Sequence, residues 1–231
     1  MRQIILDTET TGLDPATGDR IVEIACVETL NTVPTGEHFH VYIDPQRDMP
    51  DEAFRVHGLS AQFLKGKPTF DQIVEDFLAF VDDSVLVIHN AEFDMRFINA
   101  ELKRCGRDPL LMDRVIDTLA MARRKHPGSP ASLDALCSRY RIDNSRRVQH
   151  GALLDAELLA EVYVELSGGR QSTLVLASEI KVVEKAEAIE VRPRPEPLVS
   201  SVNSEDENAH RSFIGKMGEK AVWLKYLGPL S

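Results

Sequence analysis

The sequence predicts an α/β fold in which a mixed five-stranded sheet is flanked by helices and followed by a flexible C-terminal tail. Runs rich in isoleucine, valine and phenylalanine alternate with turn-forming segments near the N-terminus, which is typical of neighbouring antiparallel strands. Farther along the chain, apolar residues recur at helical spacing and are followed by short continuous apolar runs, which indicates helices that alternate with buried strands. A sheet covered by helices is the architecture that this order of elements predicts.

The expected elements can be placed along the chain from these patterns. The five expected strands are 3–7, 20–30, 38–44, 85–88 and the short run Val115-Ile116. The expected helices lie over 70–81, from about 92 to 105, around 131–140 and around 152–166. Turns are expected at 12–15 and 31–36, where glycine, proline and asparagine gather.

Length and composition predict one sizeable soluble domain with an appendage. The chain has 231 residues, of which 43% are hydrophobic and 28% charged, and no apolar run approaches the roughly 20 residues that span a bilayer. The apolar run 4–6 is too short for the core of a signal peptide. Cys26, Cys105 and Cys137 are odd in number and widely spaced, so we expect reduced thiols in a cytoplasmic protein. The net charge of −10 argues against a protein that coats DNA through a basic surface.

The expected regions are a main domain at 1–169, a flexible linker at 170–210 and a docking tail at 211–231. The composition becomes mixed and polar after Gly169, and the segment 191–197 reads VRPRPEP, which is typical of a linker. The tail regains apolar residues but is too short to bury them by itself. We therefore expect it to bind another protein; the alternative is that it folds back on its own domain.

Two acidic residues end the first expected strand. Asp7 and Glu9 are two positions apart, so strand geometry directs both carboxylates to the same face of the sheet. Carboxylates held together away from water are costly unless they are protonated or share a cation, and their oxygens suit Mg²⁺ or Mn²⁺. The pair therefore indicates a metal site, against the alternative that both acids face water.

Two further segments carry acids or a histidine at helix starts. Asp94 falls in the first turn of the helix that follows the strand at 85–88, where an acid is also favoured by the helix dipole alone. His150 precedes the last helix of the main domain and Asp155 lies on it, because two residues five apart cannot share one helical face. The alternative for His150 is a solvated loop residue.

These segments resemble the proofreading exonucleases of the DEDDh type, within the ribonuclease-H-like superfamily. The segments that carry the resemblance are DTETTGL at 7–13, HNAEFD at 89–94 and HGALLDA at 150–156. The resemblance covers about 1–167, and the segments 52–59 and 115–119 are similar to those of proofreading subunits of bacterial replicative polymerases. Together these matches imply the ribonuclease-H-like fold.

The resemblance implies a 3′–5′ exonuclease that acts on single-stranded or frayed DNA 3′ ends with two divalent cations, Mg²⁺ or Mn²⁺. Asp7 would bridge both cations, and Glu9 and Asp155 would complete the site of one. Asp94 would hold the other through water, and His150 would take the proton from the attacking water. The residues expected to hold the terminal nucleotide are Asp7, Glu9, Thr10, Thr11, Gly12, Leu13, Glu52, His57 and Asp155.

The region after the main domain implies protein partners. The segment 171–176, QSTLVL, resembles the short peptide that binds sliding clamps, through Gln171, Leu174 and Leu176. Leu176 replaces the usual phenylalanine, so a weak contact is expected. The resemblance implies that the tail binds the catalytic subunit of the polymerase, with Trp223, Leu224, Tyr226 and Leu227 as buried anchors. The sequence leaves open whether a small accessory subunit also binds.

Two other functions fit parts of the sequence. A DEDDh ribonuclease that trims RNA or short oligoribonucleotides would share the same five catalytic residues, although such enzymes usually lack the tail. A binding protein on an inactive nuclease fold is the alternative from a different class, and the presence of all five chemical residues argues against it. A comparison of DNA and RNA substrates separates these functions.

Overall fold

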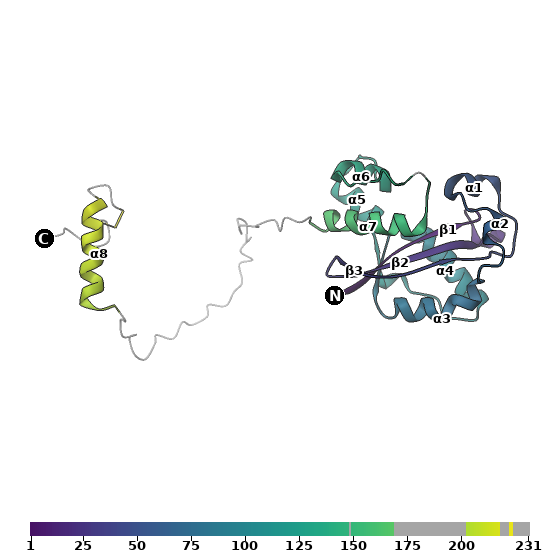
Figure 1. The fold of residues 1–231 in the computed structure, drawn as a ribbon, viewed down its shortest axis with the longest axis horizontal. Coiled ribbons are helices and arrows are strands. Elements are labelled where there is room, and N and C mark those ends of the chain that lie inside the picture. Colours follow the sequence, from purple (N-terminus) through teal and green to yellow (C-terminus); the bar gives the residue numbers. More distant parts are fainter. Residues whose placement is uncertain (148, 169–201, 218–221, 224–231) are drawn as a thin grey trace, which may run out of the picture. The chain divides into compact units, whose positions relative to one another are not determined.

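The computed structural model divides the chain into two compact units, Met1–Val175 and Leu176–Ser231 (Figure 1). The structure describes residues 1–147, 149–168, 202–217 and 222–223. Within these residues, no helix is both long and apolar enough to cross a membrane. The three cysteines form no disulfide, and two of them, Cys26 and Cys137, are buried.

The first unit is built on a mixed five-stranded sheet, as the sequence predicts. Its strands are β1 (Arg2–Thr10), β2 (Ile21–Leu30), β3 (Val33–Tyr42), β4 (Val85–Ile88) and β5 (Val115–Asp117). They lie in the order β3-β2-β1-β4-β5, so β1 is the central strand. β2 is antiparallel to β1 and β3, whereas β4 is parallel to β1 and β5.

Helices cover both faces of the sheet (Figure 1). The helices of this unit are α1 (Asp51–His57), α2 (Ala61–Leu64), α3 (Phe70–Val81), α4 (Ala91–Arg104), α5 (Thr118–Lys125), α6 (Leu133–Tyr140) and α7 (Ala152–Leu166), with 3-10 turns at Pro15–Thr17 and Met112–Arg114. Ile4 and Leu6 pack with α3 and α4, whereas Ile5 packs with α6 and α7. Because side chains alternate along a strand, the odd-numbered residues of β1 point to the α7 face.

Three features of this unit differ from the sequence prediction or were not predicted. The expected turn at 31–36 is only two residues long, because Asn31 and Thr32 both adopt positive φ, at 51° and 68°, which closes a tight hairpin and lets β3 begin at Val33. Helices α1 and α2 were not predicted. Helix α5 was also missed: Asp117 ends β5 and at the same time caps α5, accepting hydrogen bonds from the backbone N–H groups of Leu119 and Ala120.

The described part of the second unit contains helix α8 (Ser204–Met217). This helix includes the last seven residues of the predicted linker at 170–210, and the predicted boundary at 211 falls inside it. Asn203 and Asp206 exchange backbone-to-side-chain hydrogen bonds across the helix start, and the acids Glu205, Asp206 and Glu207 favour a helix N-terminus. An acidic stretch that looked like linker is thus a helix start.

Most of the residues predicted to bind the sliding clamp or the polymerase lie outside the described part of the chain. Of the expected polymerase anchors, only Trp223 is described; it is 52% exposed, and its ring centroid lies 5.5 Å from that of His210. The predicted clamp-binding residues outside the described part of the chain are Gln171, Leu174 and Leu176, and the predicted polymerase-binding residues outside it are Leu224, Tyr226 and Leu227.

Candidate active site

The parallel pair β1 and β4 positions the acidic residues. Leu6 is paired with Ile88, the last residue of β4, so Asp7 and the start of α4 lie at the same edge of the sheet. Asn90 adopts a left-handed conformation, with φ of 64°, and this turns the chain directly from β4 into α4. Asp94 then falls in the first turn of α4. Topology therefore brings a strand-end acid and a helix-start acid together.

Asp94 is held rigidly beside β1. Its side chain is 3% exposed, and Oδ1 accepts a hydrogen bond of 2.7 Å from the hydroxyl of Thr8. Burial raises the pKa of Asp94 to about 7, although the Thr8 hydroxyl opposes the shift. Asp94 is therefore a buried carboxylate in a fixed orientation, which suits a ligand of a cation.

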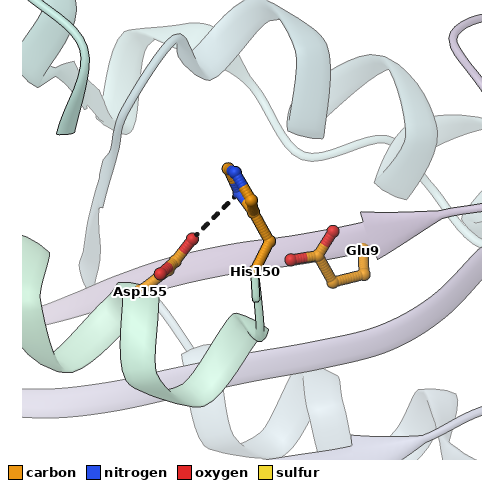
Figure 2. A group of neighbouring side chains, drawn as sticks. All are labelled: Glu9, His150 and Asp155. Atoms are coloured by element: carbon orange, nitrogen blue, oxygen red, sulfur yellow. Dashed lines mark ion pairs between the residues drawn. The ribbon is translucent and has the colours of Figure 1, made fainter. Parts of the chain in front are cut away.

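His150 and Asp155 come from the loop and helix on the other side of the same edge. The backbone N–H of His150 donates to Val56 in α1, and Asp155 lies in the first turn of α7 with 4% exposure. His150 Nδ1 lies 3.4 Å from Asp155 Oδ2, and Figure 2 shows Glu9 of β1 facing both side chains. One potential ligand atom from each of Glu9, His150 and Asp155 lies within 4.8 Å of the others.

Asp7 and Glu9 are buried close to other acidic residues. Burial, reinforced by the negative charges of Asp94, Glu9 and Asp155 as well as Glu23, raises the pKa of Asp7 well above its ordinary range. Burial and the charges of Asp155 and Glu23 likewise raise the pKa of Glu9 to about 8. Hard oxygen donors that repel one another in this way fit a divalent cation, which would remove the repulsion.

Asp155 differs from the other acids because a cation of the chain already contacts it. Arg147 binds both carboxylate oxygens, through Nε at 2.5 Å and Nη2 at 2.7 Å. Burial alone would raise the pKa of Asp155, but the hydrogen bonds from Arg147 and its positive charge outweigh it and hold the pKa below its ordinary value. Sequence reasoning missed Arg147; its position three residues before His150 is the available signal.

A second residue that sequence reasoning missed is Glu23 of β2. It is the direct partner of Glu9 in the antiparallel register and is 3% exposed. Its Oε1 accepts a hydrogen bond of 2.7 Å from Nε2 of His40 on β3. Two glutamates opposite each other on adjacent strands cannot be recognised before the strand register is known.

The loop after β1 carries the expected nucleotide-binding residues. The hydroxyl of Thr10 donates to the carbonyl of Gly12 at 2.6 Å, and Leu13 is 78% exposed at the loop tip. A Cβ on Gly12 would lie 2.3 Å from a carboxylate oxygen of Asp19, so the glycine makes room for this side chain. Thr11 is 1% exposed and bonds Asp19 at 3.2 Å, which fixes the loop.

Helix α1 brings His57 into the site. His57 is 5% exposed, and its Nδ1 accepts a hydrogen bond of 3.0 Å from the backbone N–H of Leu59. Burial lowers the pKa of His57, so the neutral ring is favoured and its one proton resides on Nε2. This buried Nε2 has no hydrogen-bond partner among the residues that the structure describes. Glu52 is exposed near the start of the same helix.

The mixed sheet and the clustered acids with a histidine define an exonuclease of the DEDDh type, and comparisons agree. Residues 4–163 match the family described as RNase_T, exonuclease. The chain is 51% identical over 222 residues to DNA polymerase III subunit epsilon of Rickettsia typhi, covering 94% of this chain and 97% of that protein. It is 41% identical over 235 residues to the subunit of the same name from Escherichia coli K12, covering 96% and 97%.

A solved structure of Exonuclease X in complex with 5′ overhanging duplex DNA is also similar, with a TM-score of 0.54 and 26% identity. The match covers 71% of this chain and 90% of that one. The chain belongs to the RNase_T exonuclease family, among the DNA polymerase III epsilon subunits. It is therefore a 3′–5′ exonuclease.

Replacing Glu9 by glutamine is expected to stabilise the metal-free protein at pH 8 and to change little at pH 5. The pKa of Glu9 is raised from 4.5 to about 8, so the folded state keeps a proton that the unfolded chain loses as pH rises. The Glu9 carboxyl therefore destabilises the fold increasingly as the pH rises from 4.5 to about 8. Urea unfolding in excess chelator should show a gain of at least about 1 kcal/mol at pH 8.

The Asp155→Asn variant is the matched comparison, because the pKa of Asp155 is lowered whereas that of Glu9 is raised. Its carboxylate stabilises the fold above the unfolded pKa, and this contribution is lost as pH falls through the folded pKa. Asp155→Asn should therefore destabilise the metal-free protein at pH 8 and much less at pH 3. A Glu9→Gln gain that is equal at pH 5 and pH 8 would contradict the assignment of the raised pKa.

Proposed function

We propose that this chain removes mismatched 3′-terminal nucleotides from DNA as part of DNA polymerase III, in the bacterial cytoplasm at the replication fork. Its catalytic residues are Asp7, Glu9, Asp94, His150 and Asp155. The observation that carries the proposal is the convergence of Glu9, His150 and Asp155 within 4.8 Å. Asp7 and Asp94 interact with this group through their charges.

Two divalent cations, Mg²⁺ or Mn²⁺, would supply positive charge to the attacking and leaving oxygens of the phosphodiester. Asp7 would be shared by both cations, with Glu9 and Asp155 completing the site of one. Asp94, which is already bonded to Thr8, would hold the other through water. Burial and mutual repulsion raise the pKa of Asp7 and Glu9, and this supports the donor set, because bound cations would stabilise the ionised carboxylates.

His150 would accept the proton of the attacking water. In the described geometry its Nδ1 accepts a hydrogen bond of 2.8 Å from Arg147 Nη2, which places the proton of the neutral ring on Nε2. The ring therefore has to leave this contact before it can act as a base. Its side chain is 49% exposed and lies in the loop before α7, so the ring has room to turn.

The terminal nucleotide would bind between the loop after β1 and helix α1. The buried Nε2–H of His57 is a hydrogen-bond donor without a partner among the described residues, and an oxygen of the substrate would satisfy it. The exposed Leu13 would pack against the terminal base. The remaining residues proposed to bind the nucleotide are Asp7, Glu9, Thr10, Thr11, Gly12, Glu52 and Asp155.

Selectivity for mismatches would come from the ease with which an end frays. A mismatched end separates from its partner strand at lower cost than a paired end, and the site would contact backbone and stacked bases rather than base edges. The net charge of −10 makes strong binding to DNA by the chain alone unfavourable. Attachment to a polymerase would compensate by raising the local concentration of 3′ ends.

We propose that residues 1–169 form the nuclease domain and that the remainder attaches it to partners. The tail at 211–231 would bind the catalytic alpha subunit of polymerase III, and 171–176 would bind the sliding clamp weakly. The apolar composition of the tail supports the first contact. Helix α8 extends the proposed attachment segment back to Ser204.

With Mg²⁺, the purified protein should shorten a 5′-labelled DNA primer from its 3′ end, and faster when that end is mismatched. Asp7→Asn and His150→Ala should each lower the rate by about 10²-fold or more, because each removes a group needed in the reaction. Asp113→Asn, in an exposed turn, is the matched control and should retain full activity. Degradation of an equivalent RNA strand alone would favour the ribonuclease, and no degradation at all would favour a binding protein.

A truncation after Gly169 should keep the nuclease activity and lose the complex with the alpha subunit. The first compact unit retains all five catalytic residues, whereas the proposed attachment segment is removed. Size-exclusion chromatography with the purified alpha subunit, beside a primer assay, measures both properties. Retention of the complex by the truncated chain would refute the proposed role of the tail.

A further inference from the structure

Arg147 contacts three chemically important groups from different elements. Its Nε and Nη2 bind the two carboxylate oxygens of Asp155 on α7, at 2.5 and 2.7 Å. Nη2 also lies 2.8 Å from His150 Nδ1, and Nη1 lies 2.8 Å from Asp134 Oδ2 on α6. The Arg147 side chain is only 7% exposed, although it belongs to a loop. Such burial of an arginine requires partners, and these contacts supply them.

We propose that Arg147 is a positioning residue, which fixes the carboxylate of Asp155 in the orientation needed to hold a catalytic cation. The inference rests on the proposed function, because it takes Asp155 as a metal ligand. A carboxylate offers about four lone-pair sites, two on each oxygen. The bidentate contact with Arg147 uses one site on each oxygen and leaves the others for a cation, so binding of both is compatible.

Arg147 is itself held in place from the opposite side. Asp134 accepts from Arg147 through Oδ2 and from Asn144 through Oδ1, at 2.8 and 3.1 Å. The backbone N–H of Arg147 donates to the carbonyl of Asn144 at 2.9 Å. Helix α6, the loop and helix α7 are therefore linked through one guanidinium. The planar geometry of arginine makes this link directional, which a lysine cannot reproduce.

The competing role for Arg147 is that of a cation substitute, which neutralises the acids and is displaced when metal binds. The two roles predict opposite effects on metal affinity. Loss of a positioning residue leaves Asp155 free to rotate and weakens cation binding, typically by about 10- to 100-fold for groups that orient ligands. Loss of a competitor would instead strengthen cation binding.

The experiment measures Mn²⁺ affinity by electron paramagnetic resonance of free Mn²⁺, using the full-length protein without substrate. Arg147→Met is expected to bind Mn²⁺ about 10-fold or more weakly than the wild type. Arg147→Lys should fall between the two, because lysine keeps the charge but not the bidentate geometry. Arg139→Met, on the exposed surface of α6, is the matched control and should bind as the wild type does.

Thermal unfolding in excess chelator establishes that each variant is folded. If Arg147→Met does not fold, the Mn²⁺ affinity of Arg147→Lys alone tests the proposal. An affinity of Arg147→Lys equal to that of the wild type, or tighter binding by either variant, overturns the proposal. Absence of Mn²⁺ binding by the wild type overturns the proposed function together with this inference. Normal wild-type binding that is lost in Asp7→Asn, with Arg147 variants unchanged, overturns this inference alone.

Discussion

Repulsion between buried carboxylates is the constraint on which the rest of the site depends. Asp7, Glu9 and Asp94 all have raised pKa values, because burial and neighbouring negative charges disfavour their ionised forms. Without compensation, such a cluster lowers the stability of the fold above neutral pH. A protein keeps this arrangement where a cation completes it, which is why the cluster itself indicates metal chemistry.

The fold holds the acids in place while they repel one another. The central strand β1 is paired with β4 up to Leu6 and with β2 along its whole length, so Asp7 and Glu9 continue a strand that is anchored on both sides just before them. Asp94 and Asp155 are each fixed by a donor, Thr8 in one case and Arg147 in the other. The compensation is uneven, since Arg147 contacts only Asp155 of these four acids. The cation site is therefore ordered in advance but electrostatically incomplete.

The sequence predicted those parts of the structure that depend on local periodicity. Strand alternation placed Asp7 and Glu9 on one face, and the apolar patterns located five strands and the helices α3, α4, α6 and α7. Features that depend on tertiary register were missed: Glu23 opposes Glu9 only once β1 and β2 are paired. Arg147 was missed because its partners lie on two helices, and α8 because its acidic start resembled a linker. The roles of the individual site residues were predicted from the resemblance to DEDDh exonucleases, not from the residue patterns.

The most direct test of the account is a crystal structure of the protein with Mn²⁺, with the ions located by anomalous scattering. We expect anomalous density beside Asp7, with Glu9 and Asp155 as ligands of one ion and with Asp94 nearest to the second. Arg147 should remain bonded to Asp155 in that structure. Mn²⁺ found only away from Asp7, or no Mn²⁺ at a concentration that supports activity, would contradict the central claim that the buried carboxylates form the catalytic metal site.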